Sequence, residues 1–161
     1  MGMAGYSEMA KMLGFNNIAD KYATIAKKMA VKWEEMANEG DHYRLAFDRK
    51  NTWSQKYNMI WDKMWGLNLF PNNVISKEIN YYLTKQNPYG LPLDSRKDYT
   101  KSDWIMWTAA MSSDQITFEK FVDPLYKYVN ETISRVPISD WYDTKTCLLY
   151  TSPSPRDMRR S

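Results

Sequence analysis

The sequence contains few of the residues from which metal sites and disulfides are built. Its 161 residues include one cysteine, Cys147, and one histidine, His42. A single cysteine excludes a disulfide within the chain, and a lone histidine lacks the partners that a zinc site needs. No apolar run approaches the roughly 20 residues of a membrane-spanning helix. We therefore expect no metal, no cofactor and no membrane partner.

The C-terminal end differs in character from the rest of the chain. From Cys147 it reads CLLYTSPSPRDMRRS, and as far as Asp157 this string resembles the in-frame translation of a common sequencing adapter. An ordinary tail rich in serine and proline is the alternative. We expect residues 147–161 to be non-native and to pack on nothing, so we leave them out of the predicted fold.

The net positive charge is also small once this end is set aside. The net charge is +3, and residues 147–161 contribute three arginines and one aspartate to it. Residues 1–146 are therefore left with +1, which provides no basic surface for a nucleic acid. We expect no nucleic-acid partner.

What the chain does contain is apolar and aromatic residues in helical spacing. Apolar residues make up 43% of the sequence and charged residues 25%, the balance of a globular protein with one core. The apolar positions recur every three or four residues, which predicts an all-α chain. The predicted helices cover residues 2–13, 18–39, 53–68, 72–86, 102–112 and 114–134.

Local signals refine three of these helices. Asn17 has the side chain of an N-cap for the second helix, and the expected inner face of that helix consists of Ile18, Tyr22, Ile25, Met29, Trp33 and Met36. In the helix over 72–86, Glu78 falls off the apolar face. Pro124 predicts a kink or a break in the last helix, with Asp123 as the new cap.

Predicted helices that are apolar on nearly all sides alternate with amphipathic ones, which have one polar face. Short links join them in pairs, and long loops over 41–52, 87–101 and 135–146 separate or follow the pairs. Antiparallel hairpins that repeat about every 50 residues predict a partial α/α toroid of about three helical hairpins. A compact six-helix bundle is the alternative, but it would not need alternate helices to be buried.

Several long motifs resemble the glutaminase A family of large secreted proteins. They are residues 40–48, 52–58, 61–63, 66–71, 89–96, 102–107 and 135–144. The resemblance implies a six-hairpin glycosidase-like α/α toroid preceded by a β-rich domain, in an extracellular or periplasmic parent. Residues 1–146 would be about half of that toroid. We expect such a fragment to need the rest of its toroid and to be inactive alone.

Three classes of function stay open at this point. The resemblance implies a hydrolase that releases ammonia from glutamine. The loops, which place acids beside aromatic residues, are equally compatible with a carbohydrate-active hydrolase. A structural helical-repeat scaffold is the third class. For either enzyme the partner would be a small-molecule substrate, an amino acid or a glycan.

Each kind of chemistry has its own candidate residues. Amide hydrolysis needs a nucleophile beside a base, and the available hydroxyls are those of Thr52, Ser54, Ser102 and Ser139. Each of them precedes or opens a predicted helix, so N-capping explains them better. A glycosidase needs two carboxylates that face each other, and the candidates are Asp41, Asp94, Asp103 and Asp140.

We predict that the three long loops meet at one end of the helices and form one wall of a cleft. The expected catalytic acids are Asp103, Asp140 and Asp41, with Asp103 first because it opens the most buried helix. The expected substrate-binding residues are His42, Asp94, Arg96, Trp104, Arg135 and Trp141. Ion pairing of these acids with arginines, and packing of the tryptophans, are the structural alternatives.

Overall fold

The structure is a computed structural model that describes residues 1–134 and 138–149. Helices dominate this part of the chain, which confirms the predicted all-α class. The helices are α1 (Gly2–Met12), α2 (Asn16–Ala37), α3 (Ile60–Trp65), α4 (Asn72–Leu83), α5 (Ser102–Ala110) and α6 (Gln115–Glu131). A 3₁₀ turn, η1 (Tyr57–Met59), precedes α3. Two short strands, β1 (Tyr99–Lys101) and β2 (Trp141–Asp143), pair antiparallel with Thr100 opposite Tyr142.

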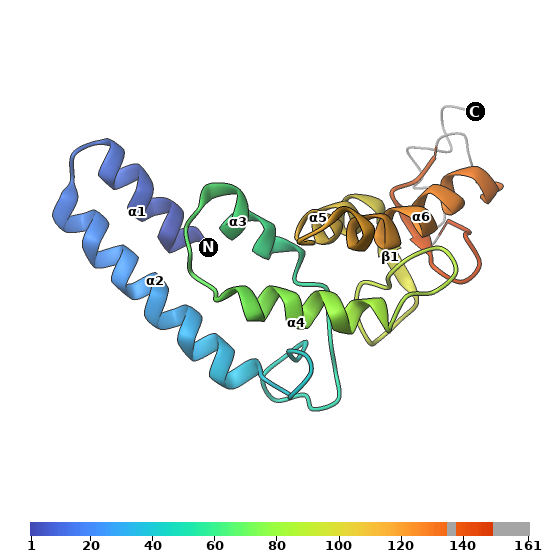
Figure 1. Cartoon of the computed structure of the whole chain (residues 1–161), viewed down its shortest axis with the longest axis horizontal. Helices are drawn as coiled ribbons and strands as arrows, with labels where there is room; N and C mark the ends of the chain where they lie inside the picture. The colour runs from blue at the N-terminus through green and yellow to red at the C-terminus, as the bar shows by residue number, and fades with distance from the viewer. Residues whose placement is uncertain (135–137, 150–161) are drawn as a thin grey trace, which may run out of the picture.

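The helices form an elongated molecule with one hairpin at each end. In Figure 1 the hairpin of α1 and α2 lies at one end, and α5 and α6 lie at the other, with α3 and α4 between them. The connections within the pairs are short, as the sequence predicts. None of the helices in residues 1–134 and 138–149 combines the length and hydropathy needed to cross a bilayer.

The fully buried residues of α2 are small, whereas the large residues predicted to face inward are either half-buried or exposed. Ala19, Ala26, Ala30 and Ala37 are buried, whereas Ile18, Met29 and Met36 are exposed. Alanine lets α1 approach closely, and the Ser7 hydroxyl of α1 donates to the Ala19 carbonyl at 2.7 Å. The predicted cap is also wrong, because α2 begins at Asn16 with Phe15 in the cap position.

The third helix begins later than predicted because the residues before it are extended. The Gln55 N–H donates to the Leu93 carbonyl at 2.8 Å, and the Ser95 N–H donates to the Trp53 carbonyl at 3.0 Å. These bonds hold residues 53–56 against the second long loop, so α3 begins only at Ile60. The prediction of a helix from Trp53 is therefore wrong.

Pro124 does not break α6, so the predicted break is wrong, while the predicted kink stays a prediction. Proline removes the N–H that would bond to the carbonyl four residues earlier, which belongs to Lys120. That carbonyl instead accepts a hydrogen bond from the Gln86 side chain at 2.7 Å. The cap of α6 is Asp114, whose carboxylate accepts the Thr117 N–H at 2.8 Å. The Gln86 side chain, which follows α4, thus supplies the hydrogen-bond donor that proline lacks.

Buried side chains form one large core and one small one. The large core includes Tyr82, Ile105, Phe121 and Tyr128, with the Tyr128 and Tyr142 rings stacked at 3.5 Å between centroids. The small core lies under the first hairpin, and its buried members are Ala4, Ala26, Ala30 and Leu69. The loops that carry the predicted site residues therefore pack against the large core.

Several large apolar side chains of α3 and α6 are exposed. Met64 and Trp65 of α3 have 64% and 59% of their surface exposed, and Ile116 and Val129 of α6 are exposed too. Their helices meet the core with one side only. Within the described residues, α3 is therefore not surrounded on all sides.

The first residues of the C-terminal stretch belong to the fold. Cys147 is only 9% exposed and lies in the large core. Its carbonyl accepts the Thr132 hydroxyl at 2.7 Å, and Leu149 forms a bridge with Tyr142. The expectation that this stretch packs on nothing is wrong for residues 147–149, while residues 150–161 lie outside the described part of the chain.

Candidate functional site

The second and third long loops meet, while the predicted meeting of all three loops as one wall of a cleft stays a prediction. The extended segment that follows the first loop joins the second loop through a bridge between Ser54 and Asp94. The second and third loops join through β1 and β2, and the Ser102 N–H donates to the Asp140 carbonyl at 2.8 Å. The beginning of α5 is thereby fixed to the loop that precedes β2.

Two of the predicted catalytic acids flank one lysine. The Lys101 ammonium lies 2.9 Å from an oxygen of Asp140 and 3.9 Å from an oxygen of Asp103. The hydrogen bond with Asp140 raises the pKa of Lys101, with a smaller contribution from Asp103. The lysine keeps both carboxylates close to one positive charge.

The two predicted tryptophans lie in the same group. Tyr57 stacks on Trp104 with 4.5 Å between ring centroids, and Tyr99 stacks on Trp141 at 4.8 Å. The two indoles meet edge to face at 6.2 Å. Each indole therefore already has a tyrosine against one face, which fits packing between the loops.

Asp94 and Arg96 form an ion pair in which the carboxylate of Asp94 is buried. Asp94 is 3% exposed, and its carboxylate accepts two hydrogen bonds from the Arg96 guanidinium, at 2.7 and 3.0 Å. Hydrogen bonding to Asp94 raises the pKa of Arg96. The acid thus pairs with an arginine, the structural alternative named for it, and a substrate-binding role for either residue stays a prediction.

Asp41 and His42 form a separate contact set. The imidazole Nδ1 lies 2.7 Å from an Asp41 oxygen, and the ring stacks on Tyr81 at 4.2 Å between centroids. The hydrogen bond with His42 lowers the pKa of Asp41. Arg135 lies outside the described residues. The other predicted residues fall into three contact sets, and their catalytic or binding roles stay predictions.

No metal site emerges from this arrangement. In residues 1–134 and 138–149, no three His, Cys, Asp or Glu side chains come together as metal ligands. The acids near the loops are bound to cations or hydrogen-bond donors instead.

A cluster of titratable side chains around the buried Glu78 lies beside these loops, and the sequence analysis missed it. Glu78 of α4 is 0% exposed, although we predicted it off the apolar face. One of its oxygens accepts the Tyr43 N–H at 2.7 Å, and the other contacts the Tyr82 hydroxyl and lies 3.7 Å from the Lys56 amine. The first long loop covers this side of α4, which is why Glu78 is buried.

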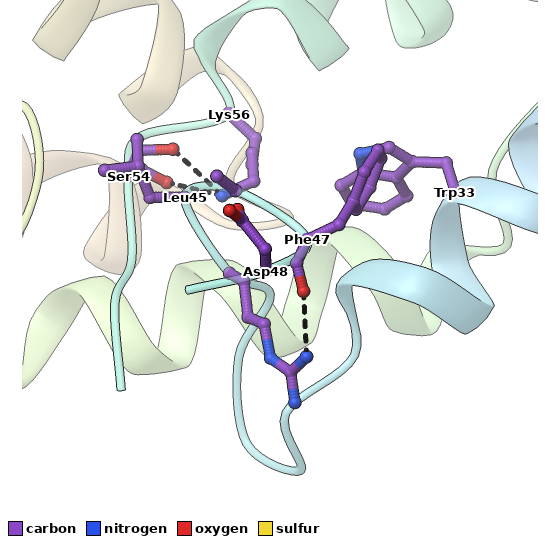
Figure 2. A pocket seen from close by; sticks show the side chains of 8 residues that line it. Trp33, Leu45, Phe47, Asp48, Ser54 and Lys56 are labelled. Atoms are coloured by element: carbon purple, nitrogen blue, oxygen red, sulfur yellow. Dashed lines mark hydrogen bonds between the residues drawn. The ribbon is translucent and has the colours of Figure 1, made fainter. Parts of the chain in front are cut away.

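Lys56 is held by oxygen atoms of the same loop. Its amine lies 3.1 Å from the Tyr43 carbonyl and 3.0 Å from both the carbonyl and the hydroxyl of Ser54, as Figure 2 shows for Ser54. Burial lowers the pKa of Lys56 and raises the pKa of Glu78. Both directions favour the uncharged forms, a free amine and a carboxylic acid.

Ser54 and Lys56 line a cavity of about 630 Å³. Its wall combines apolar side chains with the oppositely charged Arg44 and Asp48. The lining residues are Trp33, Arg44, Leu45, Ala46, Phe47, Asp48, Ser54 and Lys56. A cavity lined by a serine next to a buried lysine has the elements of a nucleophile and a base.

One signal in the sequence could have revealed this pair. Ser54 and Lys56 are two residues apart, and side chains at this spacing share a face only in an extended segment. We expected a helix there, and in a helix these two side chains would diverge. Because we predicted a helix for this segment, the sequence analysis did not bring Ser54 and Lys56 together.

Comparison with known proteins identifies the domain. Residues 1–151 match the profile described as the glutaminase A six helical-hairpin domain. The chain belongs to the glutaminase A family. This confirms the resemblance seen in the motifs of the loops and helices.

Two relatives in the glutaminase A family are fungal proteins. Glutaminase A of Aspergillus oryzae is 31% identical over 150 residues, which cover 91% of this chain and 22% of the relative. A protein named probable glutaminase from Arthroderma benhamiae is 30% identical in an alignment of 190 residues. The match covers 96% of this chain and 21% of the relative. The chain thus spans about a fifth of the length of these curated relatives.

Proposed function

We propose that this glutaminase A domain contributes a serine nucleophile and a lysine base to the hydrolysis of glutamine to glutamate and ammonia. One observation carries the proposal: the Ser54 hydroxyl lies 3.0 Å from the Lys56 amine at the wall of a cavity. A serine is a weak nucleophile unless an adjacent base takes its proton. Lys56 serves as that base because burial lowers its pKa.

The proposed reaction has two steps. Ser54 Oγ attacks the carboxamide carbon while its proton moves to Lys56 Nζ, and the C–N bond then breaks as Lys56 returns the proton to the departing ammonia. A water molecule next attacks the ester on Ser54, giving its proton to Lys56. The C–O bond to Ser54 breaks, the serine recovers its proton from Lys56, and the carboxylic acid leaves.

Ammonia release from glutamine by the full-length protein tests this role. We expect Ser54→Ala and Lys56→Met each to lower kcat/KM by more than about 10³-fold, because both are needed for proton transfer and attack. Ser76→Ala is the matched control, since the Ser76 hydroxyl of α4 is exposed and bonds only to the nearby Asn73 carbonyl. A Ser54→Ala protein that folds and keeps a tenth or more of the activity would exclude the proposal.

A carbohydrate-active function is the second candidate, and it rests on a different observation. Asp103 and Asp140 both approach Lys101, and Trp104 and Trp141 lie beside them. Paired acids near aromatic rings suit glycoside hydrolysis. Under this proposal Asp103→Asn in the full-length protein abolishes activity on a panel of glycans, and it leaves glutamine hydrolysis unchanged. No activity on any glycan would remove this candidate.

We further propose that additional helical hairpins complete a toroid around this chain. The support is the order of short-linked hairpins together with the exposed apolar sides of α3 and α6. Such hairpins, an upstream β-rich domain and an extracellular or periplasmic location are what the family resemblance implies. A structure of the full-length protein in which Met64 and Trp65 remain in solvent would contradict the first of these.

A further inference from the structure

The Tyr82 hydroxyl has three polar neighbours, and they constrain where protons sit. It accepts the Lys56 backbone N–H at 2.8 Å. It lies 2.9 Å from the Ser54 carbonyl oxygen and also contacts the Glu78 carboxyl. The hydroxyl carries one hydrogen, and a carbonyl oxygen can only accept.

A count of hydrogens decides between the protonation states of Glu78. If Glu78 were ionised, Tyr82 would face two acceptors with a single hydrogen, and one pair of oxygens would be in contact without a hydrogen between them. If Glu78 is protonated, it donates to Tyr82, and Tyr82 donates to the Ser54 carbonyl. Every contact then contains one hydrogen.

We propose that Glu78 is a neutral carboxylic acid that donates to Tyr82, and that it acts as a positioning residue for an uncharged Lys56. Lys56 then gives its two hydrogens to the carbonyls of Tyr43 and Ser54, which lie 3.1 and 3.0 Å away. Its lone pair is left for the Ser54 hydroxyl. The other oxygen of Glu78 accepts the Tyr43 N–H.

The surroundings of the pair support this arrangement. Glu78 is fully buried, and burial raises its pKa even though Lys56, Tyr82, Tyr43 and His42 act in the other direction. For Lys56, burial is again the largest influence and lowers its pKa, against Glu78 and Asp94. A neutral pair avoids the cost of placing two charges out of water. The catalytic consequence rests on the function proposed above, but the protonation state does not.

Substitution of Glu78 by glutamine separates a neutral acid from an ion pair. A glutamine side chain donates to Tyr82 and accepts from Tyr43, as the acid does, so we expect Glu78→Gln to melt within roughly 3 °C of the parent. If Glu78 were ionised, the same change would strand a buried ammonium and lower the melting temperature by roughly 10 °C. Glu35→Gln, at an exposed pair with Lys32, is the matched control.

Infrared spectroscopy of the chain at neutral pH tests the state directly, without a variant that must be stable. We expect the carbonyl band of a protonated carboxyl group, shifted in D₂O and absent from Glu78→Gln. Absence of this band from the parent would overturn the proposal.

The pH dependence of glutamine hydrolysis by the full-length protein tests the positioning role. We expect Glu78→Gln to keep kcat within about tenfold of the parent, with the acidic limb of the pH profile displaced. An unchanged profile would overturn the positioning role. If Ser54→Ala remained active while the carboxyl band was present, the proposed function would fail and the protonation state would stand.

Discussion

Gln55 shows how a single buried residue holds two loops and a helix together. Its amide nitrogen donates to the carbonyls of Leu91 and Pro92, at 3.1 and 3.0 Å, and its oxygen accepts the Thr108 hydroxyl at 3.0 Å. The side chain is almost fully buried. The first loop, the second loop and α5 are therefore linked through one amide.

Removal of this amide should be costly. We expect Gln55→Leu to lower the free energy of unfolding by about 2–4 kcal/mol, because it leaves several buried polar groups without partners. Thr108→Val, which removes only one of these bonds and keeps the side-chain shape, should cost about 1 kcal/mol. Urea unfolding of both variants measures the difference. Equal costs for the two would show that the amide is not the link.

The lowered pKa of Lys56 should become visible in Glu78→Gln as a dependence of stability on pH. The unfolded chain keeps a proton on this lysine up to a pKa of about 10.4. The folded variant loses that proton at lower pH, because burial lowers the pKa of Lys56. The free energy of unfolding should then rise with pH above the folded pKa, until the pH reaches about 10.4.

The parent provides the contrast for this measurement. In it the pair of Lys56 and Glu78 holds one proton in both the folded and the unfolded chain over the neutral range. The pair therefore contributes no pH dependence there. Urea titrations at several pH values compare the two proteins. A variant whose stability is as independent of pH as the parent's would contradict the assignment.

These two residues also show what a sequence pattern cannot reveal. The helical period of 3.6 residues placed Glu78 off the apolar face of α4, which is correct for an isolated helix. Its burial depends on the first long loop, whose Tyr43 N–H bonds to it from far away in the sequence. By contrast, Asp94 and Arg96 are neighbours in the chain, and their pairing was among the alternatives that the sequence provides.

At the scale of elements, the turn at the start of the second loop depends on Gly90. Its φ of 126° lies in a region that side chains rarely adopt. A Cβ atom there would lie 2.9 Å from Ile105 Cδ1 and 3.2 Å from the Tyr142 hydroxyl. The turn thus brings the backbone against both α5 and β2.

We expect Gly90→Ala to lower the free energy of unfolding by about 2–4 kcal/mol, from backbone strain and from the close contacts together. Gly14→Ala is the matched control, because Gly14 also has a positive φ of 79° but nothing within 4 Å of a Cβ atom. It should cost about 1 kcal/mol. Thermal or urea unfolding distinguishes the two. Similar costs would mean that strain alone, and not packing against α5, sets the effect.

Element existence was predictable here, while element ends were not. The spacing of apolar residues identified α1, α2, α4, α5 and α6. The start of α3 was missed because pairing between loops, which overrides local propensity, keeps residues 53–56 extended. The continuity of α6 was missed for a similar reason. The side chain that satisfies the Lys120 carbonyl, Gln86, follows a different helix.

At the scale of the whole molecule, the exposed apolar side chains predict self-association. They occur on several helices and in the link between α1 and α2, and they include Met9, Met12, Leu13, Phe15, Met29, Met64, Trp65 and Ile116. Surfaces of this kind are usually covered in a stable protein. We expect the isolated chain to associate or aggregate as its concentration rises, which sedimentation velocity measures. A monomer at every concentration would contradict this.

The division of the core into a large and a small part has a consequence for how the chain opens. The small core contains three alanine methyl groups and Leu69, so little apolar surface ties α1 and the adjoining part of α2 to the remainder. Amide hydrogen exchange should therefore resolve two cooperative units. The amides of α1 should exchange through a low-energy local opening, while those around Phe121 and Tyr128 should exchange only on global unfolding.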